Sequence, residues 1–165
     1  MNVALLNKML DAAVQGDDLG HWKTLPYLLD KPPVMAFGFL YVIRNRISGK
    51  LYIGKKQTKH GGKKTSRTYG KEMPWRTYES SSAHVKKDLK DLGKSNFDFV
   101  IVEHYATRGG LNYSEVEYQV KCDVLTERLD EEERLFYNAQ ISAVRWIPKE
   151  YTTHEQRLNN LKEIK

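Results

Sequence analysis

The sequence is poor in cysteine and has no long apolar run. Its single cysteine, Cys122, cannot form an internal disulfide, and no group of cysteines and histidines has the spacing of a zinc site. No apolar segment approaches the roughly 20 residues that a membrane-spanning helix needs. The first residues lack a signal-peptide cleavage pattern, so we expect a cytoplasmic protein that does not enter a membrane.

Acidic residues are absent between Asp30 and Glu72, although the chain as a whole is that of an ordinary globular domain, with 165 residues of which 40% are hydrophobic. This segment holds eleven of the 27 basic residues: Lys31, Arg44, Arg46, Lys50, Lys55, Lys56, Lys59, Lys63, Lys64, Arg67 and Lys71. A segment of one charge sign repels itself unless a polyanion neutralises it. The clustering therefore favours nucleic-acid binding over a surface that only keeps the protein in solution.

Three segments have the aromatic and β-branched composition of strands. They are residues 37–43, 50–54 and 97–103, of which the first two are joined by a turn with a glycine near its end. Residues 55–74 are polar and basic and predict a long loop. With the helices below, the pattern predicts an α+β fold: a small, three-stranded, mainly antiparallel sheet flanked by helices.

Hydrophobic periodicity predicts three helices, over residues 3–15, 83–92 and 114–125. Ser82 is the expected N-cap of the second helix. In the third helix, Ser114-x-x-Glu117 has the pattern of a capping box, in which the Glu117 carboxylate reaches back to the first backbone amide. The expected buried stripe of this helix is Val116, Val120 and Val124.

Two tyrosines, Tyr41 and Tyr52, lie on the two strands of the predicted hairpin. Aromatic residues are common in strands, so the pair alone fits packing as well as catalysis. The chain nevertheless resembles the GIY-YIG nuclease superfamily over about residues 37–141, in particular small stand-alone bacteriophage members. The resemblance rests on Gly38-Phe-Leu-Tyr41, Leu-Tyr52-Ile-Gly54, Trp75-Arg-Thr-Tyr78, Glu115-x-x-x-Gln119 and Phe-Tyr-Asn138. The family signature consists of two tripeptides. The first is degenerate here, within residues 38–41, and the second is intact at residues 52–54.

The resemblance implies an endonuclease that hydrolyses DNA with one divalent ion, Mg²⁺ or Mn²⁺, in each active site. It places Tyr41 and Tyr52 at the scissile phosphate and a glutamate on the metal. We choose Glu115 over Glu117 for the metal, because the capping box already gives Glu117 a structural function. Asn138 either positions the metal-bound phosphate or ends a turn.

The family's phosphate-clamping arginine has no clean counterpart in this sequence. Arg67 and Arg76 are the candidates, and if neither reaches the site, Lys55 or Lys56 must supply the positive charge. His84, in the first turn of the second helix, is a further catalytic candidate and is equally compatible with an exposed position. The expected nucleic-acid contacts are Lys55, Lys59, Lys63, Lys64, Arg44, Arg46, Ser81, and Trp75 and Tyr78 as stacking aromatics.

We divide the chain into an N-terminal helical extension and linker (1–36), a nuclease domain (37–147) and a polar C-terminal tail (148–165). The expected host is a phage-infected bacterium, and the purpose is homing, nicking or restriction. A homodimer, with the N-terminal helix as the contact, would supply a second active site. The alternatives are a non-catalytic DNA-binding protein on the same fold and a structure-specific or RNA-directed nuclease.

Overall fold

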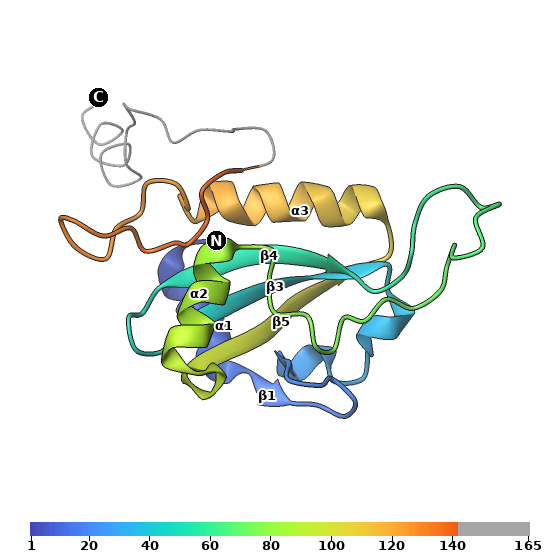
Figure 1. Cartoon of the computed structure of the whole chain (residues 1–165), viewed down its shortest axis with the longest axis horizontal. Helices are drawn as coiled ribbons and strands as arrows, with labels where there is room; N and C mark the ends of the chain where they lie inside the picture. The colour runs from blue at the N-terminus through green and yellow to red at the C-terminus, as the bar shows by residue number, and fades with distance from the viewer. Residues whose placement is uncertain (142–165) are drawn as a thin grey trace, which may run out of the picture.

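The centre of the fold is a five-stranded sheet with helices packed on it (Figure 1). The structure is a computed structural model that describes residues 1–141. The predicted tail and the last residues of the predicted 37–147 domain lie outside the described residues. The strands are β1 (Val14–Gln15), β2 (Lys23–Thr24), β3 (Gly38–Asn45), β4 (Leu51–Gln57) and β5 (Phe97–Tyr105). Their order across the sheet is β1-β2-β5-β3-β4.

The prediction of a three-stranded sheet is wrong, although the α+β class is confirmed. The three predicted strands correspond to β3, β4 and β5, and β3 runs antiparallel to both of its neighbours. The N-terminal segment adds two strands, because β2 pairs in parallel with β5 and β1 pairs antiparallel with β2. Each of these strands has only two residues, which is too short for a hydrophobic alternation to be visible in the sequence.

The helices are α1 (Val3–Ala12), α2 (Ala83–Leu92) and α3 (Arg108–Lys121). Short 3₁₀ turns occupy Pro26–Leu28, Pro33–Met35 and Lys94–Asn96. The Ser82 hydroxyl accepts a hydrogen bond from the Val85 amide, so the predicted N-cap of α2 is confirmed. Helix α3 packs against β3, β4 and β5 and lies along one face of the sheet in Figure 1.

The prediction for the third helix is wrong at both ends. Thr107 caps α3, so the helix begins at Arg108, six residues before Ser114, with Gly109 and Gly110 in its first turn. Glycine is a poor helix former, which conceals this start in the sequence. The capping box does not form, because Ser114 lies inside the helix and not at its N-cap. Glu117 instead pairs with Lys121 one turn later at 2.5 Å. The predicted valine stripe is wrong at Val120, which is 54% exposed, whereas Val116 packs partly buried against the core and Val124 is buried but lies beyond the helix.

An aromatic cluster joins the N-terminal segment to the sheet. Trp22 lies edge-on to Phe39 and Phe99, with ring centroids 5.3 and 5.5 Å away. The indole N–H of Trp22 donates to the main-chain carbonyl of Trp75 at 2.9 Å, inside the core. Trp75 is 1% exposed, and its own indole N–H donates to Glu72. The cluster therefore anchors the end of the basic segment that follows β4. Trp75 is buried too deeply to stack on a base.

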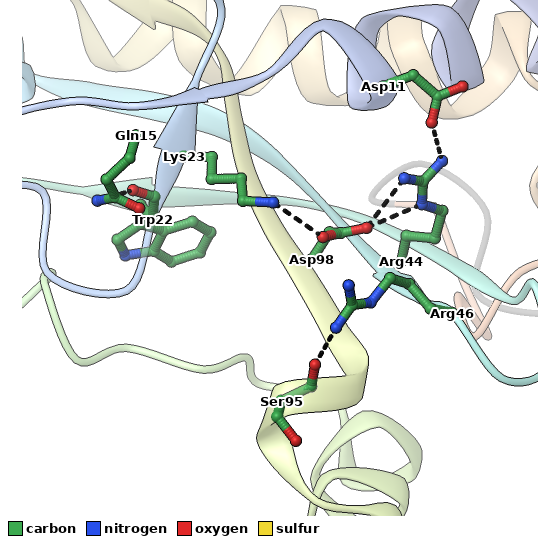
Figure 2. Close-up of polar contacts among 8 residues, drawn as sticks. All are labelled: Asp11, Gln15, Trp22, Lys23, Arg44, Arg46, Ser95 and Asp98. Carbon is green, nitrogen blue, oxygen red and sulfur yellow. Dashed lines mark hydrogen bonds and ion pairs between the residues drawn. The ribbon is translucent and has the colours of Figure 1, made fainter.

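A charged network fixes β5 between its neighbours (Figure 2). The buried carboxylate of Asp98 accepts from Arg44 of β3 at 2.9 Å and from Lys23 of β2 at 3.3 Å. Arg44 also pairs with Asp11 of α1 at 2.7 Å. Arg46 donates to the main-chain carbonyl of Ser95. Both arginines, predicted to bind nucleic acid, are thus engaged in contacts that hold the fold together.

Within residues 1–141, no helix is long and apolar enough to cross a membrane.

Candidate active site

A cleft of about 420 Å³ opens at the outer edge of the sheet, beside β4. Its walls come from β4, the segment that leads into α2, the middle of α3 and residues 137–140. Because side chains alternate along a strand, Tyr52 and Lys55 leave β4 on opposite faces. Both line the cleft, which therefore extends around the edge of the sheet.

Asn138 forms part of the edge of β4. The segment containing it continues the sheet irregularly, since Leu51 exchanges backbone hydrogen bonds with Leu135 and Tyr137 at 2.9 and 2.8 Å. The Asn138 amide then bonds to both backbone groups of Ile53, accepting from its N–H at 3.0 Å and donating to its carbonyl at 2.8 Å. This buried side chain shapes the wall of the cleft, and its polar groups are committed to Ile53.

Glu115 lies in the middle of α3 and points at β4. Its carboxylate pairs with the Lys55 ammonium at 2.6 Å, and its side chain is 12% exposed. Among the described residues that line the cleft, Glu115 is the only one with a carboxylate. The first turn of α3 lies further back, at Arg108, so the helix N-terminus does not act on Glu115. The cleft thus combines one shielded anion and one cation in direct contact.

The two tyrosines lie on the same face of the hairpin but are offset. The register pairs Tyr41 with Gly54 and Tyr52 with Ile43, and the two phenol rings lie 6.1 Å apart between centroids. Tyr52 lines the cleft, with its hydroxyl 3.4 Å from the Ser81 hydroxyl. Tyr41 is only 1% exposed and lies behind it. The expectation that both reach one phosphate from directly opposed positions does not fit this arrangement.

Burial determines the protonation of both phenols. It raises the pKa of Tyr41 well above its ordinary value, and the neighbouring phenols of Tyr52 and Tyr78 add to the effect. Burial also raises the pKa of Tyr52, against hydrogen bonds from Ser81 and Ser80 that lower it. Both groups are therefore protonated at neutral pH in the free protein.

Gly54 is required where the two rings meet. A Cβ atom at this position would lie 2.6 Å from the Tyr41 hydroxyl oxygen and 2.8 Å from the Tyr52 ring. Because Tyr41 is packed in the core, its ring cannot move aside at low cost. The glycine that ends the second tripeptide thus allows the tyrosine pair to close over the strand.

We expect Gly54→Ala to lower the free energy of unfolding by about 2–3 kcal/mol, because the new methyl group overpacks the tyrosine pair. Urea denaturation followed by tryptophan fluorescence measures this. Gly109→Ala is the matched control, since a Cβ atom there meets open space. Equal stability of Gly54→Ala and the parent protein would contradict the account of Gly54.

The serines that lead into α2 have separate contacts. Ser82 caps the helix, and the Ser80 hydroxyl accepts from the Ser82 amide at 2.9 Å. Ser81 is exposed and presents its hydroxyl at the cleft beside Tyr52. His84 is exposed on α2 and does not line the cleft. Of the two predicted site residues Ser81 and His84, the structure therefore places only Ser81 at the cleft.

Neither candidate arginine lines the cleft. Arg76 is paired with Asp18, at 2.6 Å, and with Glu72, so it ties the end of the basic loop to the N-terminal segment. Arg67 is exposed within that loop. Of the two lysine candidates, Lys55 lies in the cleft, whereas Lys56 is placed over the Tyr78 ring at 4.5 Å and burial lowers its pKa.

The basic loop, which we define as residues 58–80, extends away from the sheet (Figure 1). A single bridge between Lys59 and Glu72 closes its base. Beyond this bridge, Lys63, Lys64 and Arg67 are exposed. They therefore form a positively charged projection, separate from the cleft.

Residues 22–141 match the family model described as "Putative endonuclease segE, GIY-YIG domain". The chain belongs to the GIY-YIG endonucleases. This confirms the resemblance and identifies an enzyme that cleaves nucleic acid. The match begins at Trp22, earlier than the resemblance at residue 37, which agrees with the place of Trp22 in the core. Searches of curated proteins and of solved structures found no match.

Sequence reasoning missed one residue of the candidate site in this GIY-YIG endonuclease. Gln119 was quoted as part of a motif without a function, yet it is almost fully buried and lines the cleft beside Glu115. The sequence indicated its place, because Gln119 follows Glu115 by four residues and residues four apart on a helix share a face.

Proposed function

We propose that this GIY-YIG endonuclease hydrolyses DNA with the aid of a divalent metal ion, and that the cleft beside β4 is where the phosphodiester is cut. The observation that carries the proposal is the meeting of three groups in the cleft: the Glu115 carboxylate, the Lys55 ammonium and the Tyr52 hydroxyl. Hydrolysis of a phosphodiester needs a positioned water, a counter-charge for the phosphate and a Lewis acid.

Glu115 is the residue that would hold the ion. Its carboxylate is a hard oxygen ligand of the kind Mg²⁺ prefers, and Mg²⁺ sites commonly use one or two carboxylates together with water and substrate phosphate. Within residues 1–141 no group of three or more histidines, cysteines, aspartates or glutamates is placed to hold a metal, which fits such an open site. The ion would supply charge neutralisation at the phosphate and acidify a bound water.

Lys55 supplies the remaining counter-charge. Its ammonium pairs with Glu115 at 2.6 Å, and from this place in the cleft it would hold a phosphate oxygen beside the carboxylate that binds the ion. Lysine binds phosphate as a point charge, whereas arginine binds it through a planar fork. In this protein we assign the phosphate contact to Lys55, because Arg67 and Arg76 lie outside the cleft lining.

Tyr52 orients the attacking water. Its phenol is protonated at neutral pH, so its hydroxyl can accept from the water while donating to a phosphate oxygen or to Ser81. Tyr41 does not line the cleft and is shielded from solvent. Its ring packs behind that of Tyr52 and supports it. Asn138 supports the strand that carries Tyr52 and Lys55.

The test is the conversion of supercoiled plasmid and of a phage genome by the intact chain, with Mg²⁺, with Mn²⁺ and with chelator. We expect nicked product that requires metal, because one chain supplies one set of Glu115, Lys55 and Tyr52 and so cuts one strand at a time. Linear product at high protein concentration would indicate a dimer. Cleavage that persists in chelator would contradict the metal dependence, and parallel reactions on branched DNA and on RNA would reveal a different substrate.

The basic loop is expected to bind the DNA backbone outside the cleft. Alanine at Lys63, Lys64 and Arg67 together should reduce the steepness of log K against log salt by about 2–3, since each phosphate contact contributes about 0.9 on duplex DNA. Fluorescence anisotropy on a labelled duplex measures this, in a Glu115→Gln background that does not cut.

The control for the loop removes the same charge elsewhere. Alanine at the exposed residues Lys8, Lys121 and Arg128 changes the net charge equally but leaves the loop intact. If both triple variants lose the same salt dependence, the loop has no special contact with DNA and only the total charge matters.

A further inference from the structure

Gln119 is placed beside the proposed metal ligand. It follows Glu115 by one turn of α3, so both side chains leave the helix on the same face. Both line the cleft, and Gln119 is 4% exposed. An amide at such depth needs partners for both of its polar groups, because an unpaired polar atom away from water is costly.

The orientation of the Gln119 amide is fixed by its neighbour. Its nitrogen donates to the main-chain carbonyl of Ile53 at 3.2 Å, and the Asn138 nitrogen donates to the same oxygen. A carbonyl only accepts hydrogen bonds, so turning the amide over would bring two acceptors together. The amide oxygen must therefore point away from Ile53.

That oxygen is buried and has no hydrogen-bond partner among the described residues. The nearby cation, the Lys55 ammonium, is already paired with Glu115. The cleft thus contains two oxygen ligands on one helix face, one a carboxylate held by lysine and the other an amide oxygen without a partner. Amide and carboxylate oxygens are both suitable ligands for hard divalent cations.

We propose that the Gln119 amide oxygen and the Glu115 carboxylate are the two protein oxygens of one divalent-cation site, with Gln119 binding the ion directly or through one of its waters. The inference rests on the proposed function, in which Glu115 holds the ion. It adds a second group that makes the site more selective than a single carboxylate. It also explains why α3 presents a glutamine at this buried position.

Binding of Mn²⁺ to the DNA-free protein, measured by electron paramagnetic resonance, tests the proposal without reference to cleavage. Gln119→Met removes the oxygen at similar volume and is expected to weaken Mn²⁺ binding about tenfold or more. Gln119→Glu keeps an oxygen and adds charge, so its Mn²⁺ affinity should equal or exceed that of the parent protein. Both variants lose the hydrogen bond to Ile53, which separates the oxygen's effect from that of the strand contact.

Gln57→Met is the matched control, because Gln57 lies on β4 but does not line the cleft, and its Mn²⁺ affinity should be unchanged. Equal weakening by Gln119→Met and Gln119→Glu would overturn the proposal, as would unchanged affinity in Gln119→Met. If Glu115→Gln weakens Mn²⁺ binding and Gln119→Met does not, only the assignment of Gln119 fails. If Glu115→Gln binds Mn²⁺ as the parent protein does, the metal site of the proposed function fails as well.

Discussion

Glu115→Gln is expected to reduce Mg²⁺-dependent nicking of plasmid about 1000-fold. The substitution keeps the size of the side chain but removes the charge that would hold the ion, and among residues 1–141 no second carboxylate lines the cleft to replace it. It also leaves the Lys55 ammonium without its anion. The rate of nicking under single-turnover conditions measures the effect directly, because it does not depend on product release.

Glu117→Gln is the control for this experiment. Glu117 lies two residues further along α3 and makes an exposed ion pair with Lys121, so its loss should change nicking less than twofold and stability by about 0.5 kcal/mol. The two variants carry the same chemical change on the same helix. Should Glu117→Gln lose as much activity as Glu115→Gln, the metal ligand has been assigned to the wrong residue.

Tyr52→Phe is expected to slow nicking about 100-fold, the lower end of what a positioned proton-transfer group contributes. Its hydroxyl lies at the cleft beside Ser81, and removing it leaves the ring contacts with Tyr41 in place. Because the fold is retained, DNA affinity in chelator should be unchanged. The loss should therefore appear in the rate of the chemical step rather than in binding.

Tyr41→Phe separates the two tyrosines. The Tyr41 hydroxyl is buried behind Tyr52, so we expect a loss of less than tenfold in nicking, accompanied by a change in thermal stability. The comparison is made on both variants by the same assay, with unfolding followed in parallel. A larger loss for Tyr41→Phe than for Tyr52→Phe would show that the cleft rearranges on DNA and exposes the inner tyrosine.

The hairpin and its third strand could be predicted because local sequence determines them. The alternation of β-branched and aromatic residues in β3 and β5, and the Ser82 cap of α2, are short-range signals. The two N-terminal strands could not, since Lys23 and Thr24 become a strand only by pairing with β5, about 75 residues further along the chain. The start of α3 was missed because Gly109 and Gly110 have low helix propensity and the packing of Leu111 overrides it.

Of the candidate site, too, one part could be predicted from the sequence and another could not. Glu115, Tyr52 and Lys55 were predicted as separate members of a site, and the structure places all three at one cleft. The buried Trp75, and Arg76 with its carboxylate partners, could not be distinguished from DNA-binding residues in the sequence. Both also contact the nearby Glu72, but the contacts that bind them to the fold come from Trp22 and Asp18 of the N-terminal segment, which no local pattern indicates.

The wall of the cleft supplied by residues 137–140 has a consequence for the order in which the protein is made. Synthesis proceeds from the N-terminus, so Tyr52, Lys55 and Glu115 leave the ribosome before the segment that completes the edge of β4. A nascent chain or fragment that ends before Leu135 has every charged group of the site but no Asn138 to hold Ile53. Its cleft is open on one side, and β4 remains paired with β3 but has no partner along its outer edge. Such a chain therefore lacks one wall of the cleft in which, under the proposed function, the phosphodiester is cut.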